Sequence, residues 1–181
     1  RITPVCLGLW DDRTEAALKD KLTRARSLAP AVPVFIQLAH AGRKASSATP
    51  WNGGQLLAKD QGGWETLAPS AIPQLDGERP PHELSKAELK QLIADFVAAA
   101  KRADRIGIEG IELHGAHGYL LHQFLSPIAN QRTDEYGGSL EKRARLLLEI
   151  TAGIRAAIDR DIVADLDGLQ RARRATATAT T

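Results

Sequence analysis

Hydrophobic residues recur at helical spacing in three segments of the chain. The first segment runs from Asp12 to about Ala29, with Asp12 as its N-cap. The second begins after Ser85, which forms a capping-box pattern with Glu88, and Gly107 stands where this helix should stop. The third begins near Ser139 and carries its apolar residues along one stripe. The pattern therefore predicts three amphipathic helices.

Two short apolar runs lie between these helices and predict strands. Val32 to Ala39 is nearly continuous rather than alternating, which is typical of a strand buried on both faces, and Gln37 is its only polar member. Ile108 to Ala116 predicts a second buried strand that ends in polar groups and glycines. The connection from Ala41 to Ser85 is long for a compact domain, so we expect it to be functional or to contain short strands of its own.

A strand, a crossover helix and a second strand form a parallel βαβ unit, which indicates an α/β protein. The alternatives are a doubly wound sheet and part of a (β/α) barrel. A complete barrel needs about 250 residues, so 181 residues with two clear strands allow only a partial one. Ile162 to Ala164 is a poor candidate for a further strand. Because an acidic, then arginine-rich, then Ala/Thr-alternating sequence follows Ile158, we expect one domain over residues 1–158 and an unrelated or disordered tail over 159–181.

Composition narrows the class of protein and its partners. Hydrophobic residues make up 43% and charged residues 25%, which is ordinary for a globular protein, and the formal net charge of +2 gives no electrostatic reason to expect nucleic acid or a membrane surface. Cys6 is the single cysteine and cannot form an internal disulfide. We therefore expect a cytoplasmic protein with a small-molecule partner. The chain lacks methionine, so we also expect sequence upstream of Arg1.

The strongest chemical signal is the segment His114-Gly-Ala-His117-Gly-Tyr119, placed where the second predicted strand ends. Strand ends form the active-site rim of α/β folds. Two imidazoles this close can donate hydrogen bonds to one oxygen and stabilise negative charge that develops there. A neighbouring phenol can then deliver a proton. The sequence therefore predicts His114, His117 and Tyr119 as catalytic residues.

Two other interpretations of these histidines remain open. They can be structural, or they can bind a metal together with a third ligand such as His40. Neither a carboxylate cluster nor a cysteine cluster stands near them in the sequence, and Glu112 alternates with Leu113 along the strand.

The surrounding residues resemble the Old Yellow Enzyme family, and most closely its bacterial xenobiotic reductase and YqjM-like branch. The resemblance runs from Arg1 to about Ile158 and covers many irregular loop positions. It rests on Arg1–Pro4, Phe35–Lys44, His114–Pro127, Asn130–Ser139, Arg143 and Arg145.

This resemblance implies a (β/α)₈ TIM barrel that binds FMN, is reduced by NAD(P)H and is reoxidised by an electron-poor alkene. The family's histidine pair matches His114 and His117 and holds the carbonyl or nitro oxygen of the substrate. The matching tyrosine, Tyr119, is the family's proposed proton donor. The glutamine matching Gln37 binds the pyrimidine edge of the flavin, and an amide has the donor and the acceptor that such an edge needs.

Several conspicuous residues outside this group have alternative roles. Arg43 and Lys44 can attract an anionic cofactor or can simply be solvated. We expect the segment Asn130–Ser139 to be structural, shaping its loop and capping the next helix. Trp51 and Trp64 can line an entrance, although packing of the long connection is the role we favour.

The resemblance also implies missing parts, because the family's first strands and the C-terminal half of its barrel have no counterpart here. We therefore expect FMN and NAD(P)H binding to be weak or lost in this chain. We expect the intact parent to reduce activated C=C bonds of α,β-unsaturated carbonyl or nitro compounds and to be able to form a homo-oligomer. The competing hypotheses are a metal-dependent barrel hydrolase using His40, His114 and His117, and a non-catalytic remnant.

Overall fold

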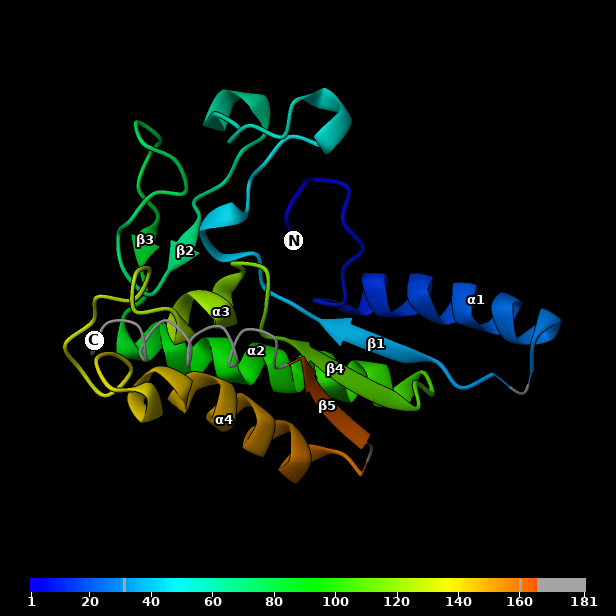
Figure 1. Cartoon of the computed structure of the whole chain (residues 1–181). Coiled ribbons are helices and arrows are strands. Elements are labelled where there is room, and N and C mark those ends of the chain that lie inside the picture. Colours follow the sequence, from blue (N-terminus) through cyan, green and yellow to red (C-terminus); the bar gives the residue numbers. More distant parts are fainter. Residues whose placement is uncertain (31, 160, 166–181) are drawn as a thin grey trace.

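In the described part of the chain, the core is a parallel sheet of three strands with helices packed against one face. The computed structural model describes residues 1–30, 32–159 and 161–165, the last of these as backbone only. The sheet has the order β1 (Phe35–Leu38), β4 (Gly110–His114), β5 (Asp161–Asp165), and all three strands run parallel (Figure 1).

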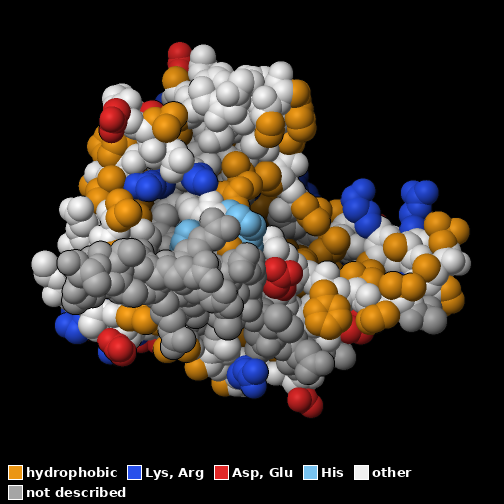
Figure 2. All heavy atoms as spheres, in the orientation of Figure 1, with side chains coloured by type: hydrophobic (Ala, Val, Ile, Leu, Met, Phe, Trp, Pro, Cys, Tyr) orange, Lys and Arg blue, Asp and Glu red, His pale blue; other side chains and the backbone are white. Residues whose placement is uncertain are grey.

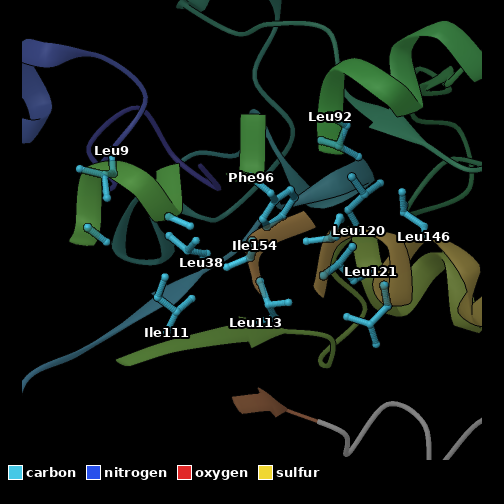
Figure 3. Packing of buried hydrophobic residues seen from close by; sticks show 14 of the residues in the cluster. Leu9, Leu38, Leu92, Phe96, Ile111, Leu113, Leu120, Leu121, Leu146 and Ile154 are labelled. Carbon is cyan, nitrogen blue, oxygen red and sulfur yellow. The ribbon is translucent and has the colours of Figure 1, made fainter. Parts of the chain in front are cut away.

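Alternation along the strands gives the sheet one apolar face and one polar face. Gln37 lies opposite Glu112 in the register, so these two residues and His114 point to the same side. The intervening residues point to the other side, where Leu38, Ile111 and Leu113 are almost fully buried against the helices (Figure 3). The fold thus leaves the chemically active side chains on the face that α2 and α4 do not cover.

Two long helices, α2 (Lys86–Arg105) and α4 (Leu140–Ala157), pack against each other beneath the apolar face. Ser85 and Glu88 cap α2 reciprocally, and the Ser139 side chain accepts from the Lys142 N–H at the start of α4, as the sequence predicts. Helix α1 (Asp12–Leu28) extends away from the sheet (Figure 1), and its N-cap is Asp11 rather than the predicted Asp12.

The long connection after β1 contains short elements of its own, as expected. They are the 3₁₀ turns η1 (Gly42–Lys44), η2 (Pro50–Asn52) and η3 (Lys59–Gln61) and the paired strands β2 (Leu67–Ala68) and β3 (His82–Glu83). Trp51 is 79% exposed, so the packing role predicted for it is wrong. Trp64 is half-buried and stacks with the Arg1 guanidinium, 4.5 Å from the ring centroid. A short helix that the sequence pattern does not predict, α3 (Leu120–Leu125), follows β4.

Two predictions about the strands are wrong. The sequence indicates no strand after Ile158, but β5 pairs with all five residues of β4. It also predicts a first strand buried on both faces, whereas Phe35 of β1 is 51% exposed. Strand β1 lies at the edge of the described sheet, and its Phe35 and Gln37 side chains, which share one face, are exposed. The predicted tail beyond residue 165 lies outside the described residues.

The arrangement decides between the two α/β architectures. A doubly wound sheet carries helices on both faces, whereas here α2 and α4 cover one face and polar residues occupy the other. The fold is therefore a partial (β/α)₈ barrel, as the sequence predicts. Across residues 1–30, 32–159 and 161–165, the structure contains no helix with the length and apolar character needed to span a bilayer.

Candidate active site

The predicted catalytic residues lie at the carboxyl end of β4 and in the turn that follows it. His114 is the last residue of β4 and is only 5% exposed, His117 is exposed, and Tyr119 is half-buried at the N-cap of α3. Figure 2 shows histidine side chains near the middle of this face of the molecule, with Lys and Arg side chains just above them. The strand end therefore presents its polar groups to an accessible surface.

The two imidazoles face each other closely. The His117 Nδ1 atom lies 3.3 Å from His114 Nε2, and the ring centroids are 5.1 Å apart. An oxygen atom placed about 2.9 Å from each nitrogen would complete a triangle with them. The Tyr119 ring centroid is 5.3 Å from that of His114, so the phenol belongs to the same group of side chains. At 3.3 Å the two nitrogens can share one hydrogen bond, and with a proton on each of them both can instead donate to one substrate oxygen.

Gln37 reaches the same region from the neighbouring strand. Its side-chain Nε2 donates to Glu112 Oε1 at 2.9 Å across the polar face of the sheet. Gln37, His114, His117 and Tyr119 are among the residues that line a cavity of about 940 Å³, whose other walls include the N-terminal segment and one side of α2. The structure thus brings all four predicted site residues to one cavity, although Gln37 comes from β1 and the other three come from the end of β4 and the turn after it.

His40 also lines this cavity, but one of its ring nitrogens accepts a hydrogen bond from the backbone of its own loop. The Gly42 N–H donates to His40 Nδ1 at 3.0 Å, so that nitrogen carries no proton. Removal from water, with a smaller contribution from the positive N-terminus, lowers the pKa of His40 to about 4. Within the part of the chain that the structure describes, no three His, Cys, Asp or Glu side chains gather as metal ligands. The geometry therefore gives no support to the metal-dependent alternative.

The segment Asn130–Ser139 has the structural role predicted for it. Asn130 is buried, and its amide donates to the carbonyl oxygens of Phe124 and Tyr136, each at 2.7 Å. Arg132 forms a two-pronged pair with Asp134, with its shorter contact at 2.6 Å. These contacts tie the loop to α3 and position the start of α4.

Two residues near the site, Glu112 and Lys44, make contacts with predicted site residues that the sequence analysis does not identify. Glu112 bonds Gln37, and its position two residues before His114 on a strand is a usable signal, because residues two apart share a face. Lys44 donates from Nζ to the His117 carbonyl oxygen at 2.8 Å, a contact that no sequence pattern indicates. Arg43 donates instead to the Ile72 and Pro73 carbonyls, so it braces the long connection.

Comparison with known proteins agrees with the fold. A model of the NADH:flavin oxidoreductase / NADH oxidase family matches residues 2–165. An NADH:flavin oxidoreductase of Gibberella zeae is 52% identical over 162 residues, which cover 87% of this chain and 39% of that protein. An NADPH dehydrogenase of Clostridium acetobutylicum is 39% identical over 155 residues, covering 86% of this chain and 41% of that protein. The chain thus spans about two fifths of the length of these two relatives.

A solved structure shows the same similarity. Morphinone reductase superposes with a TM-score of 0.68 and 29% identity, over 87% of this chain and 44% of that one. Since the family model covers nearly all of the described residues, the chain belongs to the NADH:flavin oxidoreductase / NADH oxidase family, and its resemblance to the Old Yellow Enzymes is confirmed.

Proposed function

We propose that this chain carries the substrate-oxygen site of an FMN-dependent NAD(P)H ene-reductase, an enzyme that reduces C=C bonds conjugated to a carbonyl or nitro group. The observation that carries the proposal is the 3.3 Å separation of the two imidazole nitrogens at the end of β4. Names of relatives support the redox chemistry, since they include an NADPH dehydrogenase and an NADH:flavin oxidoreductase.

In the proposed reaction His114 and His117 bind the acceptor oxygen. Hydrogen bonds from their facing nitrogens withdraw electron density from the conjugated system and stabilise the negative charge that reaches the oxygen during reduction. Because His114 is buried and its ring cannot move far, the site favours one placement of that oxygen. The β-carbon of the alkene then points away from the histidines into the cavity.

Tyr119 supplies the proton in this proposal. Its ring lies beside His114, on the same cavity wall, so its hydroxyl can approach the α-carbon of an alkene whose oxygen the histidines hold. Reduction of the C=C bond consumes two electrons and two protons in all, and Tyr119 provides the proton that does not travel with the electron pair. The phenol regains its proton from solvent.

The residues present fit the edge of a flavin ring. The Gln37 amide offers a donor and an acceptor on the open face of the sheet, and it lines the same cavity as the histidine pair. When bound, FMN would supply the hydride chemistry, with NAD(P)H as the source of electrons. Gln37 would hold the ring edge, and Glu112 would keep the amide oriented through its 2.9 Å bond.

A chimera tests the proposal separately from the capacity of this chain to bind FMN alone. Residues 2–165 would replace the matching segment of the Clostridium acetobutylicum NADPH dehydrogenase. FMN content, reduction by NADPH and anaerobic reoxidation by 2-cyclohexenone would then be measured. We expect all three to be present. We also expect His114→Ala and His117→Ala each to slow reoxidation by about 100-fold, the usual effect of losing one donor to a developing oxyanion, without affecting reduction by NADPH.

His82→Ala is the matched control, because His82 lies on exposed β3 and does not itself line the cavity, although its partner Glu88 does. A chimera that binds FMN and accepts electrons from NADPH but does not pass them to the enone would refute the proposed acceptor class. Unchanged reoxidation in both site variants would refute the role of the histidine pair.

A further inference from the structure

The turn that presents His117 has an unusual backbone. His117 has φ 55° and Gly118 has φ 74°, so two consecutive residues adopt the left-handed conformation. Glycine enters that region freely, but a residue with a Cβ has a steric penalty there and needs support from its surroundings. The direction of the His117 ring therefore depends on whatever holds this turn.

Side chains from two other elements supply that support. The Gln123 amide donates to the Gly118 carbonyl at 2.7 Å, and the Gly118 N–H donates to His122 Nδ1 at 2.7 Å, both partners lying on α3. The Lys44 ammonium of η1 donates to the His117 carbonyl at 2.8 Å. A Cβ at position 118 would stand 3.1 Å from the Lys44 ammonium, so glycine leaves the space that the lysine occupies.

Lys44 differs from the other supports because it also contacts Tyr119. Its ammonium lies 5.5 Å from the centroid of the Tyr119 ring, within the range of a cation–π interaction. Among the described side chains, no carboxylate lies within salt-bridge distance of this ammonium. One positive charge thus touches both residues that act with His114 in the proposed mechanism.

We propose that Lys44 is a positioning residue that sets His117 and Tyr119 relative to each other, and so determines how well the histidine pair holds an oxyanion. This inference rests on the proposed function. The lysine acts through the His117 backbone and the Tyr119 ring and does not itself line the cavity. Because η1 follows β1, Lys44 also links the strand that carries Gln37 to the turn that carries His117.

The test uses the full chain without flavin, with ¹⁵N-labelled histidine. Two quantities would be measured by NMR: the nuclear Overhauser contact between the His114 and His117 rings, and the affinity for p-nitrophenolate as an oxyanion probe. We expect Lys44→Met to remove the ring contact and to weaken probe binding by about tenfold, since a displacement of about 1 Å at a site of this kind costs up to about 100-fold. Lys44→Arg should restore both. Lys90→Met, which removes an exposed charge from α2, should change neither.

The midpoint of urea unfolding distinguishes an effect of Lys44 on side-chain positions from a loss of the fold. A lost ring contact at an unchanged midpoint supports the inference, whereas Lys44→Met with the contact and the affinity intact overturns it. Should Lys44→Met fail to fold, the Lys44→Gln and Lys44→Arg variants would be compared instead. If both show the same ring contact and the same probe affinity, the charge of Lys44 has no positioning role. Failure of the unmodified chain to bind the probe would count against the proposed function, while the ring contact would still decide the role of Lys44.

Discussion

His40 and His114 are the same residue type at the ends of neighbouring parallel strands, yet their surroundings give them different roles. His114 faces a second imidazole across 3.3 Å, whereas His40 accepts a hydrogen bond from the Gly42 N–H in its own loop. Removal from water keeps His40 neutral, with its pKa lowered to about 4. A histidine held neutral in this way affects stability rather than catalysis.

This state of His40 predicts an acid-sensitive fold. The folded pKa lies below the usual value of 6.5, so the stabilisation is complete above about pH 6.5 and is lost as the pH falls through about 4. Relative to a His40→Gln variant, the wild-type chain should lose about 2 kcal/mol of unfolding free energy between pH 7.5 and pH 4.5, an amount discounted for partial solvent exposure. Urea unfolding at both pH values measures the difference. If the unfolding free energies of the two proteins fall by the same amount between these pH values, His40 does not contribute to the acid sensitivity.

The strand-end rule selects His114, His117 and Tyr119 from the sequence, whereas Gln37 takes its predicted role from the family resemblance, and all four line one cavity. Lys44 cannot be selected in the same way. Its contact with the His117 carbonyl depends on a 3₁₀ turn and on two left-handed residues far along the chain, and neither follows from periodicity. A side chain that acts through irregular backbone can be identified only from a three-dimensional structure.

Among the elements, the long helices are predictable because several local signals agree. Helix α2 has an apolar stripe, a reciprocal cap at Ser85 and Glu88, and a glycine just past its end. Strand β5 has no comparable signal: the run Asp-Ile-Val-Ala-Asp is short and ends in charge, and its pairing with β4 is a long-range event. Two-residue strands such as β2 and β3 are likewise defined by their partners.

The cap of α2 should be measurable by itself. Ser85 Oγ accepts from the Glu88 N–H, and the Ser85 N–H donates to the Glu88 carboxylate at 2.7 Å. Ser85→Ala should lower the unfolding free energy by about 1 kcal/mol, and Ser85→Gly by only a few tenths. Ser27→Ala in the last turn of α1 is the control, because that hydroxyl caps no N–H group. Equal stability of Ser85→Ala and the unmodified chain in urea unfolding would contradict the capping role.

At the scale of the whole molecule, the described helices cover the sheet on one side. Helices α2 and α4 bury the apolar face, while Gln37, Glu112 and His114 occupy the other, and the chain spans about two fifths of the length of the relatives that it matches. A flavin nucleotide draws its binding free energy from both faces and several edges of its ring and from its phosphate. Among the described side chains near the histidine pair, Gln37 is the one that we assign to the ring edge.

The isolated chain should therefore bind FMN weakly. One amide contact and one open cavity wall cannot provide the roughly 8 kcal/mol that micromolar affinity requires, so we expect a Kd above about 0.1 mM. Quenching of flavin fluorescence and equilibrium dialysis would measure it, with the full-length Clostridium acetobutylicum NADPH dehydrogenase as the positive control. Gln37→Ala should weaken even this residual binding, whereas Lys90→Met should leave it unchanged. A tight, yellow, one-to-one complex of the unmodified chain would instead mean that the open face alone binds the flavin ring.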